Sequence, residues 1–168
     1  MMYEDVDFSW RAWLAGYKVA SARESIVYHF RGGIIGQNFR NFKNMYIRNT
    51  ARNHLITLLK NYEPLNAFLS YPMAALLILV ESAYVFVRID RRKGLAGIMG
   101  VLESFWRIPN TIASRVTIQE NRQICDRELM HVMHRFSPAF LMSNSILLAE
   151  NGRRNLPKTE VDLRFDDE

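Results

Sequence analysis

The first apolar stripe of the chain lies near its N-terminus and recurs at helical spacing. Trp10 and Leu14, with Trp13 beside them, form this stripe, and Gly16 follows it. Asp5 stands before the stripe at the position of an N-cap, and a glycine after a periodic run is a common helix stop. The pattern predicts an amphipathic helix that begins at an acidic turn and ends at Gly16.

The polarity pattern then changes to short runs rich in β-branched and aromatic residues. Lys18–Ser21 and Ser25–Phe30 are predicted as two short strands joined by the turn 22–24, and a loop opens at Arg31–Gly33. This stretch is the reason for expecting an α/β fold class, although the rest of the chain is predicted to be mainly helical.

A long basic segment, residues 37–62, is predicted to form one amphipathic helix. Its apolar residues fall on one side at mixed three and four spacing, and basic residues occupy the remainder. Two interpretations stay open: a helix on a membrane surface, or a helix packed on the rest of the domain with a solvated face. The apolar set is Phe39, Phe42, Tyr46, Ile47, Leu55, Leu58 and Leu59, and the basic set is Arg40, Lys43, Arg48, Arg52 and Lys60.

The most apolar stretch is Leu65–Val87, and the basic run Arg88–Lys93 follows it directly. A membrane crossing takes about 20 apolar residues, so the length suffices. Pro72 and especially Glu81 argue against a crossing, because a carboxylate near the hydrocarbon centre is costly. We therefore expect a helix that lies in or dips into the membrane interface, with the basic run at anionic headgroups.

The rest of the chain is predicted to be helical up to a mixed tail. Leu95–Ile108 is a second amphipathic helix, and its small residues would let another helix approach closely. The segment 110–133 is predicted as one or two helices, and the tail 137–168 is expected to be partly disordered. The small residues are Gly94, Gly97 and Gly100, and the charged residues expected on solvated faces are Arg115, Glu120, Arg122, Asp126, Arg127 and Glu128.

Composition narrows the classes of partner. The chain has 168 residues and a net charge of +5, which suggests an anionic partner, either nucleic acid or membrane phosphate. The basic residues alternate with long apolar faces and no nucleic-acid motif is present, so we expect no nucleic acid as a partner. Cys125 is the only cysteine, which excludes a disulfide within the chain and favours a reducing compartment.

Groups able to do chemistry lie at element ends in the first third of the chain. Glu4 and Asp5 stand at a helix start, Arg11 on that helix, and His29 at a strand end. A carboxylate there can accept a proton from an attacking hydroxyl, and an imidazole can bind a divalent metal. A purely structural role stays open for these residues, since such acids are commonly helix caps and a strand histidine is commonly a hydrogen-bonded structural residue.

Several motifs in one order resemble family 2 glycosyltransferases, closest to the rhamnosyltransferase-like and galactofuranosyltransferase-like members. They are Tyr3–Arg11, then Ala15–Lys18, then Ile26–Gly33, then Tyr46–Tyr62, and the segment Ser104–Arg127 with its Trp106–Pro109. The resemblance covers roughly residues 1–133 and includes the acceptor side of the catalytic domain.

The resemblance implies an inverting transfer from a nucleotide-sugar donor to a lipid-linked or cell-envelope polysaccharide acceptor at the cytoplasmic membrane face. Asp5 matches the catalytic base, Glu4 an acidic neighbour that helps hold the acceptor, and Arg11 a position that supports the acidic turn. His29 matches a histidine that helps bind the divalent metal, Mg²⁺ or Mn²⁺, on the donor diphosphate. The metal would neutralise the leaving group.

One departure from the family pattern is the position of the acidic turn. The nucleotide-binding half and its Asp-x-Asp metal motif precede this turn in the family, whereas here Asp5 is the fifth residue. We therefore expect the C-terminal part of a GT-A-type domain in residues 1–36, followed by the helix 37–62 and a membrane-associated extension in 63–136. The alternative is a non-catalytic membrane-surface module, or one half of a split transferase that needs a partner chain or a second copy.

Overall fold

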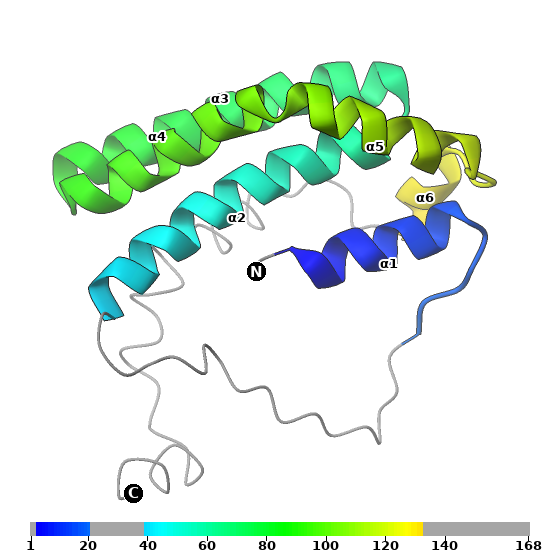
Figure 1. The fold of residues 1–168 in the computed structure, drawn as a ribbon, viewed down its shortest axis with the longest axis horizontal. Helices are drawn as coiled ribbons and strands as arrows, with labels where there is room; N and C mark the ends of the chain where they lie inside the picture. The colour runs from blue at the N-terminus through cyan, green and yellow to red at the C-terminus, as the bar shows by residue number, and fades with distance from the viewer. Residues whose placement is uncertain (1–2, 21–38, 133–168) are drawn as a thin grey trace, which may run out of the picture. The chain divides into compact units, whose positions relative to one another are not determined.

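Six helices make up the part of the chain that the computed structural model describes, residues 3–20 and 39–132 (Figure 1). They are α1 (Glu4–Leu14), α2 (Phe39–Asn61), α3 (Pro64–Arg88), α4 (Arg91–Trp106), α5 (Ile108–Glu120) and α6 (Asp126–Val132). These ranges contain no strand. The mainly helical prediction is thus confirmed here, and the tail 137–168 lies outside the described residues.

The predicted α/β class is wrong for the described residues. Lys18, Val19 and Ala20, the start of the first expected strand, have no regular structure and are exposed. Within the described residues, this backbone forms no ladder with another segment. The end of α1 is instead joined to the segment before α6, because Gln123 and Ile124 donate their N–H groups to the carbonyl of Leu14, at 2.7 and 3.3 Å. Residues 21–38, with the rest of the expected strand pair, lie outside the described residues.

The end of α1 follows the sequence prediction closely. Trp10 and Leu14 are buried, as their spacing indicated. Gly16 has a φ of +82°, its N–H bonds to the carbonyl of Trp13, and the N–H of Tyr17 bonds to that of Ala12. This pair of bonds is a Schellman motif, which needs a left-handed residue and so favours glycine.

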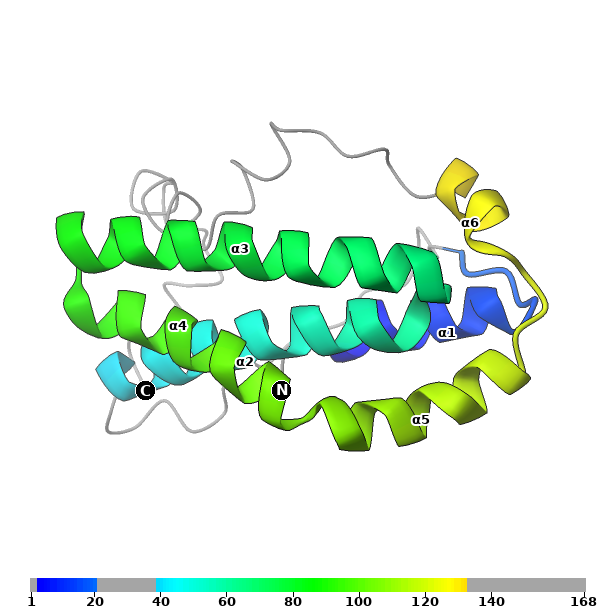
Figure 2. The same cartoon turned by 90° about the horizontal axis from the view of Figure 1, so that it is seen from above.

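Helix α4 packs against both α3 and α2, and Figure 2 shows α3 and α4 side by side. The expected small-residue stripe makes this possible. A Cβ at Gly94 would lie 2.5 Å from the backbone of Phe86 on α3, and one at Gly100 would lie 2.5 Å from the carbonyl oxygen of Arg48 on α2. The close approach predicted for these glycines is therefore confirmed.

Two clusters of buried side chains hold the helices. The first joins Leu55 of α2, Tyr71 and Ala75 of α3, and Val101 of α4. The Tyr71 hydroxyl lies 2.8 Å from the Ser104 hydroxyl, which satisfies both polar groups inside this core. The second cluster is Trp10, Leu14 and Leu129, with Trp13, Leu58, Tyr62 and Ile118 packed around it, and it fixes α1 on the end of α2.

Helix α2, which accounts for most of the helix predicted over 37–62, packs on its neighbours. Ile47, Ala51 and Leu55 are buried at four-residue spacing, whereas Tyr46, expected on the apolar side, is 37% exposed. Arg48 and Arg52 both pair with Glu103 of α4. Helix α2 thus has the packed side that the second interpretation expects.

Three charged residues expected on solvated faces are instead structural. Arg115 of α5 donates to the carbonyls of Leu59 and Tyr62, each at 2.6 Å, and so caps the C-terminal end of α2. Asp126 is 1% exposed and accepts from the Glu63 N–H and the Asn66 amide, each at 2.7 Å. Arg122 pairs with Asp126. Glu120, Arg127 and Glu128 are exposed, as predicted.

Candidate functional site

Helix α1 begins two residues earlier than the sequence indicated. Tyr3, with φ of 73°, occupies the N-cap position, and its carbonyl accepts the Asp7 N–H at 2.9 Å. Asp5 therefore lies in the first turn of α1, and its prediction as the N-cap is wrong. Its Oδ1 accepts the N–H of Val6 at 2.9 Å, while both Glu4 and Asp5 are exposed to solvent.

Asp7, not Asp5, is the acidic residue that connects α1 to the bundle. Its Oδ2 accepts from Lys60 Nζ at 2.8 Å and from Arg11 Nε at 3.0 Å, and its Oδ1 accepts from the Asn61 amide at 3.0 Å. Its side chain is 14% exposed. Arg11 thus braces the turn through Asp7, one helical turn away, and this pair was visible as an i, i+4 spacing. No sequence spacing indicated the bonds that Lys60 and Asn61 donate to Asp7.

Tyr3 and His54 form a second connection that the sequence did not reveal. The Tyr3 hydroxyl lies 2.6 Å from His54 Nδ1, and the two rings meet edge to face with centroids 5.1 Å apart. Burial lowers the pKa of His54, and burial, with smaller effects of Tyr46 and Asp5, raises the pKa of Tyr3. Both side chains therefore favour their neutral forms at pH 7, and their contact joins the start of α1 to α2.

The described residues do not fit the metal that the resemblance implies. Among them, no group of three or more His, Cys, Asp or Glu side chains comes together as a metal site would require. His29, the expected ligand, lies outside the described residues. We therefore derive no step through a metal from this part of the chain.

What remains at the acidic turn is a pair of solvated carboxylates on a firmly held helix. Both lie in the first turn of α1, at the positive end of the helix dipole. An ionised carboxylate can accept a proton from a hydroxyl group placed against it. Neither Glu4 nor Asp5 lines the pocket between α2 and α4.

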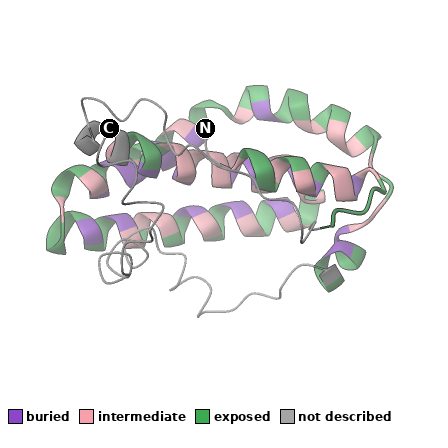
Figure 3. Ribbon diagram, turned by 90° about the horizontal axis from the view of Figure 1, so that it is seen from below, coloured by how far each residue is buried: buried purple, intermediate pink, exposed green. Residues whose placement is uncertain are grey.

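A broad apolar surface covers the side of α3 that does not pack on α4. Buried positions recur along the packed side, at Ala67, Tyr71, Ala75, Ser82 and Val85, and exposed positions lie between them (Figure 3). We call the exposed set the α3 apolar face: Leu65, Phe68, Leu69, Met73, Leu76, Leu77, Val80, Tyr84, Phe86 and Val87, with exposed fractions from 38% to 77%.

Helix α4 adds a narrower stripe of the same kind. Leu95, Met99, Leu102 and Trp106 recur at three and four spacing and are 38% to 84% exposed. We call these four residues the α4 stripe.

On α3, Glu81 is the only charged residue between Pro64 and Arg88, and it is half-buried.

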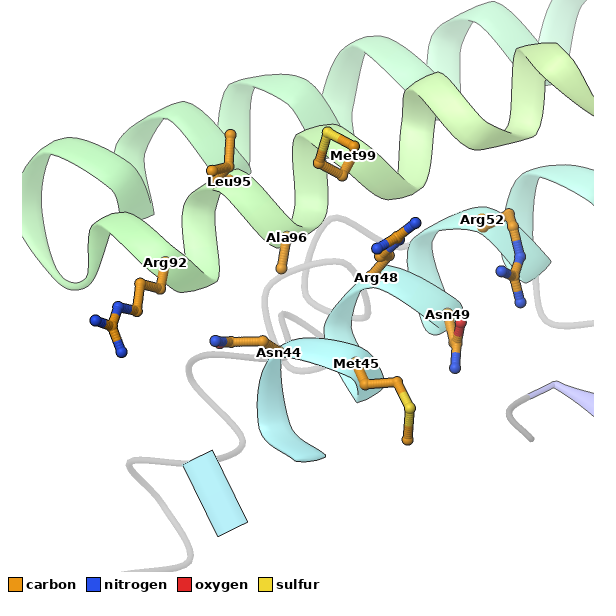
Figure 4. A pocket seen from close by; sticks show the side chains of 9 residues that line it. All are labelled: Asn44, Met45, Arg48, Asn49, Arg52, Arg92, Leu95, Ala96 and Met99. Atoms are coloured by element: carbon orange, nitrogen blue, oxygen red, sulfur yellow. The ribbon is translucent and has the colours of Figure 1, made fainter. Parts of the chain in front are cut away.

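A pocket of about 570 Å³ lies between α2 and α4 and is open to solvent (Figure 4). We call it the arginine groove. Arg48 extends from α2 toward α4, while Arg92 extends from the first turn of α4. The remaining lining residues are Asn44, Met45, Asn49 and Arg52 on α2 and Leu95, Ala96 and Met99 on α4.

The groove carries a net positive charge. Its three guanidinium groups give +3, and Glu103, which pairs with Arg48 and Arg52, brings −1, which leaves +2. The hydrogen bond from Arg48, together with the charges of Arg48 and Arg52, lowers the pKa of Glu103 despite its partial burial. The carboxylate is therefore ionised at neutral pH and holds two of the three arginines in place.

Comparison with known proteins finds no matching family model, no matching curated protein and no matching solved structure. The resemblance to glycosyltransferases therefore stays a prediction from the sequence motifs.

Proposed function

We propose that this chain is the acceptor-side, membrane-binding part of an inverting glycosyltransferase, acting at the cytoplasmic face of the cell membrane. The observation that carries the membrane component is the α3 apolar face. Soluble monomers rarely expose a continuous apolar patch of this kind, and such patches mark interaction or membrane surfaces. Helix α3 is also long and apolar enough to cross a bilayer by length and composition.

Packing within the bundle favours attachment at the interface over a crossing. Helix α3 lies against α4 and α2, which carry Arg48, Arg52, Arg92 and Glu103. Taking α3 across the hydrocarbon with these neighbours would bring charged groups into the membrane at a high cost. An orientation with the α3 apolar face in the interface keeps these charged groups out of the hydrocarbon, at the level of the headgroups or in water.

The basic turn between α3 and α4 supports the same orientation. Arg88, Arg91 and Arg92 are exposed there, and only Asp90 offsets them in the run 88–93. Each basic side chain near an anionic bilayer contributes about 1 kcal/mol of attraction. The turn would thus lie among lipid headgroups.

The catalytic component rests on the exposed acidic turn and its motif. Asp5 is the proposed base for the acceptor hydroxyl, Glu4 helps hold the acceptor, and Arg11 supports the turn through Asp7. The nucleotide-sugar donor, the glycan or lipid-linked acceptor, and a divalent metal with His29 as a ligand remain parts of this proposal.

A non-catalytic membrane-surface module is the second candidate. It is favoured by one observation: Glu4 and Asp5 line no part of the arginine groove, so this pocket offers them no bound acceptor. A partner chain or a second copy that completes the site would reconcile the two candidates.

Vesicle flotation tests the membrane component. We expect the protein to float with phosphatidylcholine vesicles in high salt, because apolar burial is not screened by ions. The double variant Leu76→Glu, Val80→Glu should remain in solution. Phe8→Glu is the matched control, since Phe8 is 67% exposed on α1, away from the α3 apolar face. Flotation of the double variant equal to the control would refute the assignment.

Sugar transfer tests the catalytic component. In a preparation of the enzyme that transfers sugar, Asp5→Asn should abolish transfer and leave donor binding unchanged, because the base acts on the acceptor. Glu120→Gln, an exposed acidic residue on α5, is the control for charge. Turnover retained by Asp5→Asn would leave the membrane-surface module as the better description.

A further inference from the structure

We propose that the arginine groove binds the phosphate monoester headgroup of an anionic lipid, with the alkyl part of that lipid along the α4 stripe. This inference rests on the proposed membrane attachment and names the class of lipid that the protein recognises.

The polar half of the groove has the chemistry for a phosphate. Guanidinium groups present planar sets of donors that match phosphate oxygens, and such charge-assisted bonds are among the strongest available. The groove charge of +2 suits a phosphate monoester, which carries about −1.5 to −2 at pH 7. Asn44 and Asn49 add neutral amide donors on the same side.

Two of the three arginines are arranged in advance of binding. Glu103 joins Arg48 and Arg52, whose side chains are 44% and 18% exposed, so holding them near the groove costs less entropy on binding. Arg92 projects from the first turn of α4, and Asp90 fixes that turn by accepting the backbone N–H groups of Arg92 and Lys93 at 2.8 and 3.3 Å.

The apolar half of the groove distinguishes a lipid from a free anion. Leu95 and Met99 line the groove and are also members of the α4 stripe, which continues through Leu102 to Trp106. A site for free phosphate gains nothing from exposed aliphatic side chains at its edge. A lipid gains about 0.8 kcal/mol for each CH₂ that it buries there.

The lipid preference of the full chain tests this inference. Phosphatidylcholine vesicles are doped with equal molar fractions of phosphatidic acid, a monoester, or phosphatidylglycerol, a diester. We expect several-fold tighter binding to the phosphatidic acid vesicles. Arg92→Gln should remove this preference and Arg127→Gln should keep it, because both lose one exposed arginine but only Arg92 lines the groove. Equal binding to both vesicles, or equal behaviour of the two variants, would overturn the inference.

A soluble ligand separates this inference from membrane attachment itself. Dihexanoyl phosphatidic acid, below its micelle concentration, should shift the fluorescence of Trp106, which is 84% exposed on the α4 stripe. Leu95→Ser should weaken this ligand and leave inorganic phosphate unaffected. If inorganic phosphate binds as tightly as the lipid, the groove is a free-anion site and the lipid assignment is wrong. If the protein binds the soluble lipid but does not bind vesicles, only the proposed membrane attachment is refuted.

Discussion

The carboxylate of Asp126 accepts a hydrogen bond of 2.7 Å from the backbone N–H of Glu63, 63 residues earlier in the chain. Asn66 and Arg122 donate to the same carboxylate, so one buried side chain joins the start of α3 to α6. The bond satisfies an N–H at the helix start that would otherwise lack a partner.

Replacing this carboxylate should therefore be costly. We expect Asp126→Ala to lower the free energy of unfolding by about 3 kcal/mol, because it leaves Arg122 and two further donors without their partner. Urea denaturation followed by circular dichroism measures the change. Glu128→Ala, an exposed acid on the same helix, should change it by less than about 0.5 kcal/mol. Equal effects of the two variants would show that Asp126 does not have this role.

Gly100→Ala should destabilise the fold although alanine is the better helix former. In an isolated helix the change would gain about 1 kcal/mol. Here the new Cβ would meet the Arg48 carbonyl oxygen at 2.5 Å and the Ala51 Cβ at 2.9 Å, so α2 and α4 must separate. We expect a net loss of about 1–3 kcal/mol, measured by thermal or urea unfolding. Thr117→Ala, on an exposed position of α5, is the control for propensity alone.

Asp7 and Asp5, both in the first turn of α1, should differ in how much they contribute to the free energy of unfolding. Asp7→Asn should lower the free energy of unfolding by about 1–3 kcal/mol, since it removes the charge that Lys60 and Arg11 share. Asp5→Asn should change stability by less than about 0.5 kcal/mol, because Asp5 is exposed. Denaturant unfolding of both variants gives the comparison. A large loss of stability in Asp5→Asn would contradict the assignment of the structural role to Asp7.

The partly buried His54 predicts a pH dependence of stability. Its folded pKa is lowered from 6.5 by burial, so below about pH 6.5 the unfolded chain binds a proton that the folded chain does not. Stability contributed by neutral His54 is complete above this pH and declines as the pH falls below it toward the lowered folded pKa. His54→Gln should flatten this decline, whereas His131→Gln, at an exposed position, should leave it unchanged. Unfolding curves across this pH range provide the test.

Local features of the fold were predictable from sequence because their causes are local. Helical spacing identified Trp10 and Leu14 as core residues, and Gly16 marked the end of α1. Small residues at three-residue spacing indicated the close contact made by α4. The boundary expected between the helix Leu95–Ile108 and the segment 110–133 lies within two residues of the observed one, since α4 ends at Trp106 and α5 begins at Ile108.

The errors share a different physical origin. Arg115 and Asp126 looked like solvated charges because their partners, Leu59, Tyr62 and Glu63, lie more than 50 residues away. The same separation concealed the bond between Tyr3 and His54. Spacing along a helix shows which residues share a face, but it does not show which distant backbone group needs a partner.

The candidate site was predictable to a similar extent. The sequence indicated an acidic turn supported by Arg11, but it did not distinguish Asp5, which is exposed, from Asp7, which is bonded to α2. The arginine groove was missed because Arg48 and Arg92 come from separate segments that only the packing of α2 on α4 brings together.

The capping of α2 by α5 has a consequence for the dynamics of the bundle. Arg115 and Gln119 of α5 together donate to the last carbonyls of α2 and the residue after it, from Leu59 to Tyr62. If α5 detaches, these carbonyls lose their donors at the same moment, so the last turn of α2 frays with it. In native-state hydrogen exchange, the amides of α5 and of the last turn of α2 should therefore share one opening free energy, and loss of the Arg115 side chain should lower it for both.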